Sequence, residues 1–95
     1  MPAYLIADVE VIDGQAYEEY RKQVPTLITA HGGRYLARGG VTEVLEGEWK
    51  PRRTVIVEFP SVERAKEWWN SPEYAKPMAM RRAASKGRLV FLEGV

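Results

Sequence analysis

The run Thr54-Val55-Ile56-Val57-Glu58-Phe59 is the densest cluster of β-branched residues in this 95-residue chain. β-Branched and aromatic side chains fit a pleated, packed surface, so the run predicts a strand at the centre of a sheet. Pro60-Ser61 closes the strand, and Ser61 is a suitable N-cap for a short helix over Val62–Asn70. The fold is therefore expected to alternate strands and helices around this segment.

The N-terminal third predicts a strand followed by a helix. Residues 3–12 alternate between two faces with period two, which is typical of a strand with one face in a core. Asp13-Gly14 then offers an N-cap and a turn for a helix from about Gln15 to His31. Pro25 lies inside this helix and is expected to kink or break it, because proline lacks the N–H of the backbone ladder. Gly32-Gly33 is expected to end the helix, with one glycine in the left-handed conformation.

The segment between this helix and the central strand predicts one long, bent second strand. Arg34–Arg38 forms its first part and Val41–Glu46 its second, with Gly39-Gly40 as a bulge or turn between them. Residues 48–51 then form a hairpin loop. In this arrangement Arg34 and Arg38 share one side of the strand.

The C-terminal third predicts a second helical region and a last strand. Ser71-Pro72 is a helix start, a capping serine followed by proline at the first helical position. Pro77 is expected to divide the segment up to Ala84 into a turn and a helix. Residues 85–87 end that helix, and Arg88–Glu93 forms a strand that is apolar on both faces and is therefore covered on both faces.

These elements in order predict an α+β, ferredoxin-like βαββαβ fold: a four-stranded antiparallel sheet with two helices on one face, in a single domain over residues 1–95. The other sheet face would present Ile6, Ile56 and Val90 to solvent. Exposed apolar faces of this kind mark association surfaces. A two-fold homodimer that packs sheet on sheet is the expected partnership.

Composition excludes several classes of function. The formal net charge is +1, which argues against binding nucleic acid by phosphate neutralisation. The third strand also lacks the glycine and stacking aromatics of RNA-recognition domains. The chain has no cysteine and one histidine, so no metal site and no cofactor are expected. No apolar run is long enough for a membrane span, and Met1-Pro2-Ala3-Tyr4 shows no basic leader, so a cytoplasmic location is expected.

Several motifs together resemble the domain-of-unknown-function family 1330, over nearly the whole chain. They are His31-Gly32-Gly33-Arg34-Tyr35-Leu36-Ala37-Arg38-Gly39-Gly40, Leu45-Glu46-Gly47-Glu48-Trp49, Val57-Glu58-Phe59-Pro60-Ser61 and Trp68-Trp69-Asn70-Ser71-Pro72-Glu73-Tyr74. That family is placed in the dimeric α/β-barrel superfamily, which includes cofactor-independent monooxygenases, muconolactone isomerases and polyketide cyclases. The resemblance implies a homodimer in which two sheets form one barrel, with a small-molecule pocket between the sheet and the helices of each subunit. It does not imply a particular reaction.

Aromatic side chains with polar tips are the first candidates for such a pocket. Tyr20, Trp68 and Tyr74 combine a large contact area with a hydrogen-bonding group, which suits an aromatic ligand. The alternative is that they are ordinary core residues, and this alternative is favoured for Tyr17 and Trp69.

Charged candidates follow. His31 is the side chain best suited to proton abstraction near pH 7, although a histidine in the last turn of a helix also favours the helix dipole without any catalytic role. Arg34, and with it Arg38, could hold a ligand carboxylate in a bidentate pair. Asp8 is a second acid/base candidate with a strong alternative as a solvated strand residue. The basic pairs at 52–53 and 81–82 are interpreted as solvated.

Three functions remain open from the sequence. The first is a cofactor-free enzyme acting on a small organic molecule, aromatic or a carboxylic acid, with His31 as the catalytic residue and Tyr20, Arg34, Trp68 and Tyr74 binding the substrate. The second is a small-molecule-binding module without turnover. The third is a structural dimer whose aromatic residues are core.

Overall fold

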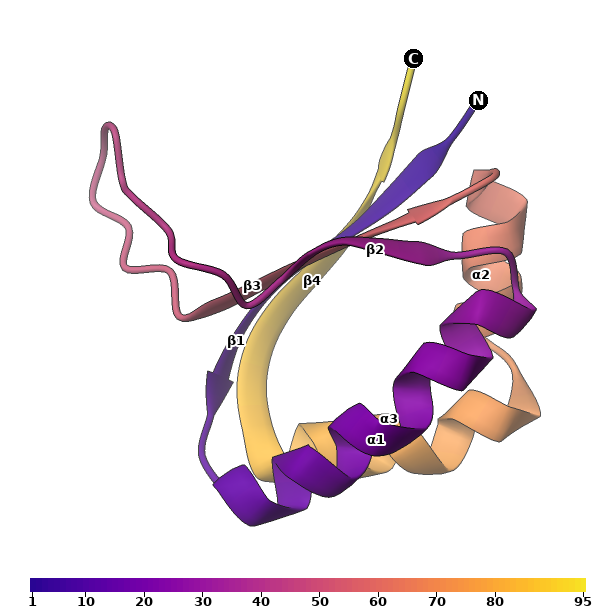
Figure 1. Ribbon diagram of the computed structural model, residues 1–95, viewed down its shortest axis with the longest axis horizontal. Coiled ribbons are helices and arrows are strands. Elements are labelled where there is room, and N and C mark those ends of the chain that lie inside the picture. Colours follow the sequence, from indigo (N-terminus) through magenta and orange to yellow (C-terminus); the bar gives the residue numbers. More distant parts are fainter.

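The computed structural model describes residues 1–95 and consists of one four-stranded antiparallel sheet with three helices on its concave face (Figure 1). In chain order the elements are β1 (Ala3–Val11), α1 (Gly14–Ala30), β2 (Arg34–Arg38), β3 (Arg53–Phe59), α2 (Val62–Trp69), α3 (Pro72–Ala84) and β4 (Ser85–Glu93). The ferredoxin-like βαββαβ prediction is confirmed, with its second helical region divided into α2 and α3.

The strand order is β2-β3-β1-β4, so β1 and β3 are central, and the predicted central position of β3 is confirmed. β1 pairs with β3 from Ala3↔Phe59 to Val9↔Arg53. It pairs with β4 along nine positions, from Ala3↔Glu93 to Val11↔Ser85. Because side chains alternate across a strand, this register sets every second residue of β1 against the helices and the others on the open face.

Helix α1 begins and ends where the sequence predicts. The Asp13 side chain accepts a hydrogen bond from the Ala16 N–H at 3.1 Å, which satisfies one free donor of the first turn. At the other end Gly32 has φ +79°, the left-handed conformation that glycine adopts without strain. The helix runs through Pro25 without a break, since its face around Val24 and Ile28 is buried against the sheet.

The second helical region differs from the prediction at Pro77. Helix α3 is continuous from Pro72 to Ala84 with Pro77 inside it. The missing N–H removes one backbone hydrogen bond, whereas Pro77 itself is buried on the same stripe as Tyr74 and Arg81. We attribute the continuity of the helix to this burial.

The junctions around α3 also differ from the prediction. Ser71 does not cap α3 through its side chain; its hydroxyl donates to the Trp68 carbonyl at 2.8 Å, at the end of α2. Strand β4 follows α3 without a linker, at Ser85 rather than Arg88, because pairing with β1 extends to Val11.

The predicted second half of the bent strand does not form. Residues 41–46 belong to a long exposed loop, seen to project from the sheet in Figure 1. Gly39, with φ +72°, donates its N–H to the Thr54 carbonyl at 2.8 Å, so the chain turns away from the sheet beside the first residues of β3. Asp8 ties the loop to the sheet: its carboxylate accepts from Trp49 Nε1 at 3.1 Å and from the Arg52 N–H at 2.9 Å. Asp8, an acid/base candidate from the sequence, therefore uses both carboxylate oxygens to accept hydrogen bonds from the loop.

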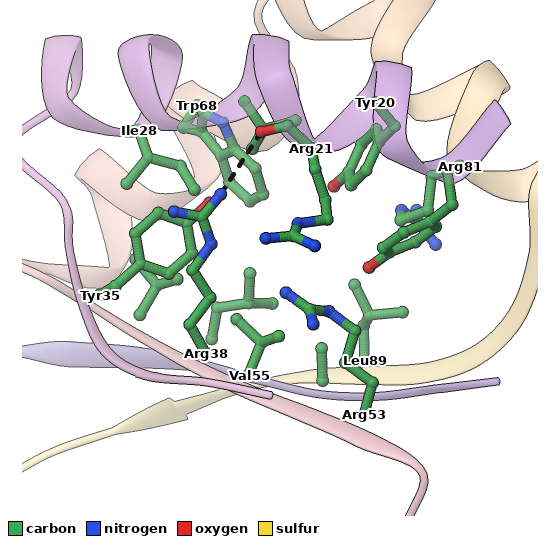
Figure 2. Close-up of a pocket in the computed structure, with 15 residues that line it drawn as sticks. Tyr20, Arg21, Ile28, Tyr35, Arg38, Arg53, Val55, Trp68, Arg81 and Leu89 are labelled. Carbon is green, nitrogen blue, oxygen red and sulfur yellow. Dashed lines mark hydrogen bonds between the residues drawn. The ribbon is translucent and has the colours of Figure 1, made fainter. Parts of the chain in front are cut away.

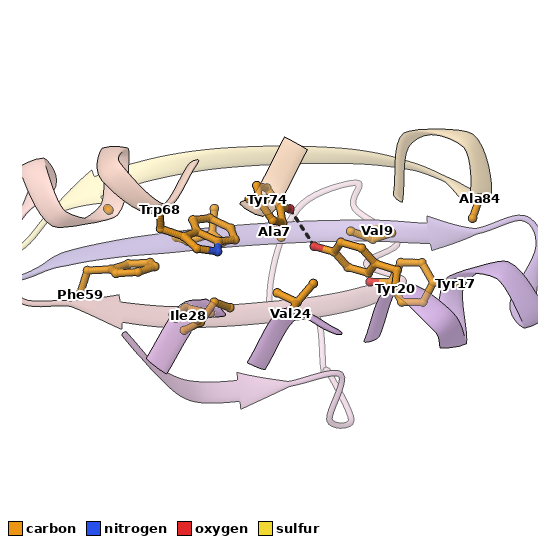
Figure 3. Packing of buried hydrophobic residues seen from close by; sticks show 13 residues of the cluster. Ala7, Val9, Tyr17, Tyr20, Val24, Ile28, Phe59, Trp68, Tyr74 and Ala84 are labelled. Carbon is orange, nitrogen blue, oxygen red and sulfur yellow. Dashed lines mark hydrogen bonds between the residues drawn. The ribbon is translucent and has the colours of Figure 1, made fainter. Parts of the chain in front are cut away.

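The core lies between the helices and the sheet, and Figure 3 shows it as a layer of aromatic and aliphatic side chains. Its largest fully buried members are Trp68, Tyr74 and Phe59. The Trp68 ring lies 4.3 Å from the Tyr74 ring and 5.6 Å from the Phe59 ring, centroid to centroid. Such tilted ring contacts add to the stabilisation that comes from the buried area of the rings. No helix of the protein is both long and apolar enough to span a bilayer.

Candidate functional site

A pocket lies between α1, α3 and the concave face of the sheet (Figure 2). It contains about 470 Å³ of space including its mouth, of which about 40 Å³ can be reached by the centres of water molecules. One water needs roughly 10–15 Å³ of such space, so the pocket has room for a few waters. Fifteen residues line it: Leu5, Ala7, Tyr17, Tyr20, Arg21, Val24, Ile28, Tyr35, Arg38, Arg53, Val55, Val57, Trp68, Arg81 and Leu89.

Three arginines from three different elements meet in this pocket, and we call Arg21, Arg38 and Arg53 the arginine triad. They extend from α1, β2 and β3, and Figure 2 shows their guanidinium groups pointing toward one another. Nε of Arg21 and Nε of Arg53 are buried without a hydrogen-bond partner. Arg38 donates from Nη2 to the Arg21 carbonyl at 3.4 Å and lies over the Tyr35 ring, 4.5 Å from its centroid. The triad thus has N–H donors without a hydrogen-bond partner in the protein.

The pocket has almost no negative charge to balance the triad. None of its lining residues is Asp or Glu. The one carboxylate that reaches the triad is Glu18, 3.3 Å from Nη1 of Arg21, and both of these side chains are about half exposed. An exposed pair of this kind contributes little, about 0–1 kcal/mol. The pocket is therefore a concentration of positive charge over an apolar floor.

A β-bulge separates the two arginines that were expected on one side of β2. The register between β2 and β3 shifts between Tyr35 and Ala37, which turns Arg38 to the pocket side. Arg34 stays on the open face, where Nε donates to Glu58 Oε1 at 2.8 Å. The predicted common side is therefore wrong, because one extra residue reverses the alternation of a strand.

The aromatic candidates cluster at the helical side of the pocket. Tyr20 and Trp68 line it, while Tyr74 lies directly behind Tyr20, with the two hydroxyl oxygens 2.8 Å apart. Nε1 of Trp68 is buried without a partner, which leaves a further unused donor in the pocket wall. Burial is the largest cause that raises the pKa of Tyr20, and Tyr74 raises it further. Tyr20 therefore stays protonated near neutral pH and can donate a hydrogen bond.

His31 lies outside the pocket lining. It occupies the C-cap of α1, and because a carbonyl oxygen only accepts, its Nδ1–H donates to the Leu27 carbonyl at 2.9 Å. The structure thus brings Tyr20, Trp68 and Tyr74 together and separates them from His31 and Arg34.

Sequence reasoning missed three arginines of the pocket, namely Arg21, Arg53 and Arg81. Residues 53 and 81 belong to basic pairs that were interpreted as solvated, yet Arg81 is only 6% exposed. The periodicity of the sequence does indicate that residues 53 and 81 face inward. Position 53 has the same strand phase as the buried Val57 and Phe59, and position 81 continues the helical stripe of Tyr74.

The hydroxyl pair yields a test of stability. A Tyr20→Phe variant removes the hydrogen bond to Tyr74 and leaves that hydroxyl buried, so we expect it to lose about 1–3 kcal/mol of unfolding free energy at pH 7. The raised pKa of Tyr20 means that the wild type also loses stability as the pH rises above about 10, where the unfolded tyrosine ionises and the folded one does not. The difference in unfolding free energy between the wild type and the variant should therefore become smaller between pH 10 and 11.

Urea unfolding at pH 7, 10 and 11 measures this gap. Tyr17→Phe is the matched control, since it removes a phenol from the same helix face and leaves the Tyr20–Tyr74 pair in place. A gap that stays constant across this pH range would contradict the assignment.

A ferredoxin-like sheet with a pocket under its helices places the protein among small α+β domains of that architecture. The sequence profile of the family described as "Domain of unknown function (DUF1330)" matches residues 2–95, and the chain belongs to this family. The resemblance identified from the motifs is thus confirmed. No functionally curated protein matches the sequence.

Solved structures share the fold at low identity. A protein of unknown function from Rhodopseudomonas palustris has a TM-score of 0.82 and 22% identity, over 99% of this chain and 82% of that one. SnoaB, a cofactor-independent oxygenase from Streptomyces nogalater, has a TM-score of 0.69 and 10% identity, over 99% and 93%. A dimeric ferredoxin-like protein of unknown function from Jannaschia sp. has a TM-score of 0.67 and 12% identity, over 99% and 100%. These similarities show the fold alone.

Proposed function

We propose that this protein binds a small aromatic carboxylic acid in the pocket between its helices and its sheet, without a cofactor. The observation that carries the proposal is the arginine triad over an apolar, aromatic floor with no acidic lining residue. Guanidinium groups pair with carboxylates through two parallel hydrogen bonds, and tyrosine and tryptophan rings provide contact area for a ligand ring. In this proposal Tyr20 and Trp68 contact the ligand, and Tyr74 positions Tyr20.

Binding is the activity that the lining residues support best. They include no His, Asp, Glu, Lys, Cys or Ser, so no general base that titrates near pH 7 faces the ligand. Turnover in this pocket would rest on the reactivity of the ligand itself, with the arginines stabilising a negative charge that develops on it. Cofactor-independent oxygenation is described for SnoaB, which shares the fold.

The ligand enters by displacing arginine side chains. Small-molecule pockets usually measure about 300–1,000 Å³, whereas water centres reach only about 40 Å³ here. Arg38 lies at the exposed rim, and arginine side chains have many accessible rotamers, so an outward swing can open the pocket.

Calorimetric titration with benzoate and its neutral isostere benzamide tests the proposal. We expect benzoate to bind at least about tenfold more tightly, since charge-assisted hydrogen bonds contribute about 1.5–3 kcal/mol. Bound benzoate should also raise the melting temperature in proportion to its concentration. Equal affinity for the two compounds, or binding of neither, would show that the triad is not a carboxylate site.

We also propose that the protein is a homodimer that packs sheet on sheet. The open face presents Val90 and Leu92, which are 57% and 54% exposed, beside the half-buried Ile6 and Ile56. Water contact with a continuous apolar surface of this kind is unfavourable, and a second copy with two-fold symmetry offers a matching surface. Dimeric proteins with this fold, such as the one from Jannaschia sp., support the proposal.

A further inference from the structure

Arg81 is a buried cation without a counter-ion. It extends from α3 into the pocket, is 6% exposed, and its Nε is buried without a hydrogen-bond partner. All ion pairs within 4.0 Å involve other residues. Its guanidinium carbon lies 5.7 Å from the centroid of the Trp69 ring, a cation–π contact. A cation held this deep without a counter-ion is unfavourable for folding of the empty protein.

Packing alone gives no reason for an arginine at this position. The stripe of α3 that faces the core otherwise consists of Tyr74, Pro77 and Ala84, and a methionine would fill the same space without a charge. The adjacent Arg82 is exposed and carries its charge in solvent. The position of Arg81 therefore suggests that its charge acts on something that enters the pocket.

Arg81 lies apart from the arginine triad. Figure 2 shows it next to Tyr20, on the far side of the pocket from Arg38. Its charge lowers the pKa of that phenol, although burial and Tyr74, which raise it, have larger effects. The pocket thus has polar groups on two sides, the triad on one and Arg81 with Tyr20 on the other, and its lining also includes apolar side chains such as Leu89.

We propose that the ligand carries two oxygen-bearing groups at opposite ends of an apolar ring: a carboxylate that binds the triad, and a second carboxylate or a phenolic hydroxyl that binds Arg81 and Tyr20. This inference rests on the proposed function and specifies its ligand. Two separated cationic ends with nothing acidic between them favour a ligand with two anionic groups over one with a single carboxylate. A second carboxylate would supply the counter-ion that Arg81 lacks, whereas a phenolic hydroxyl would accept a hydrogen bond from its guanidinium group.

The test compares benzoate with 1,3- and 1,4-benzenedicarboxylate and 4-hydroxybenzoate in calorimetric titrations at fixed ionic strength. At least one of the disubstituted compounds should bind the wild type about tenfold or more tightly than benzoate. In an Arg81→Met variant that advantage should fall below about threefold, while the affinity for benzoate should stay within about threefold of wild type. Arg82→Met, the exposed neighbour, is the matched control and should keep the full advantage.

The outcomes separate this inference from the proposed function. If benzoate binds but no disubstituted compound binds more tightly, or if the advantage survives in Arg81→Met, the inference is wrong and the proposed function stands. If neither benzoate nor any of the three compounds binds, the proposed function fails and this inference fails with it. Should Arg81→Met not fold, as judged by circular dichroism, Arg81→Gln replaces it, and the wild-type comparison decides by itself whether two anionic groups are preferred.

Discussion

A variant with both Ile6→Asp and Val90→Asp is expected to be a folded monomer. These residues face each other directly across β1 and β4, and Ile6 also faces Ile56 across β1 and β3. They therefore occupy the middle of the open face. Two-fold symmetry doubles each substitution, so the dimer interface would contain four new carboxylates without partners.

The expected size of this effect is large. Burying an unpaired carboxylate costs several kcal/mol in practice, and about 4 kcal/mol already corresponds to a thousandfold change in a dissociation constant. The dissociation constant of the dimer should therefore rise by roughly a thousandfold or more. The protomer itself should remain folded, because the core lies on the other face of the sheet among residues such as Leu5 and Val57.

Analytical ultracentrifugation over a hundredfold range of concentration measures this change. Thr26→Asp places the same charge on the exposed side of α1, across the molecule from the open face, and should leave the dimer intact. A wild-type protein that sediments as a monomer at all concentrations would overturn the proposed homodimer. A double variant that remains a dimer would place the interface elsewhere.

The fold was largely predictable because its signals are local. The alternation along residues 3–12 determines which face of β1 enters the core, and Asp13 and Ser61 cap the helices that the sequence assigns to them. Gly32 takes the left-handed conformation at the predicted end of α1. Each of these features depends on a few residues that are neighbours in the chain, so the sequence alone is enough to predict it.

The errors arose where tertiary pairing decided the structure. Residues 41–46 have strand-like composition, but they have no neighbouring strand because β3 begins only at Arg53. The same holds for the start of β4, which pairing with β1 moved from Arg88 to Ser85. Pro77 remained inside a helix because its stripe is buried, and burial is a property of the folded chain. Strand propensities and the rules for proline in helices describe isolated segments, so they could not predict these outcomes.

The candidate site was predictable in its aromatic part and in Arg38, but not in its other arginines. Tyr20, Trp68 and Tyr74 were selected because an aromatic ring with a polar tip suits a ligand pocket, and the structure brings them together. Arg21, Arg53 and Arg81 were missed because a basic side chain in a sequence is normally solvated. Arg38 was a candidate, but it was expected beside Arg34, and the bulge in β2 turns it to the pocket side instead. A site built from charges on four elements becomes visible only when those elements are assembled.

The arginine triad should bind its ligand at a cost to the stability of the empty protein. A variant with both Arg38→Met and Arg53→Met is expected to lose more than about a hundredfold in affinity for benzoate, since each lost charge-assisted hydrogen bond contributes about 1.5–3 kcal/mol. The same variant should unfold at a higher temperature when no ligand is present. Arg53 now leaves its Nε buried without a partner, which costs about 1–3 kcal/mol, and methionine removes that group while keeping its aliphatic contacts.

Thermal unfolding and calorimetric titration on the same samples measure the two effects together. A net gain of about 1 kcal/mol raises the melting temperature of a domain of this size by about 4–8 °C. Arg52→Met is the matched control: Arg52 is the exposed neighbour of Arg53, lies outside the pocket lining, and should change neither property. If the double variant melts at a lower temperature than wild type and still binds benzoate, the arginines are structural supports. If the double variant instead binds benzoate more weakly and melts at a higher temperature, the arginines are present to bind a ligand. A protein optimised only for stability would not retain these charges.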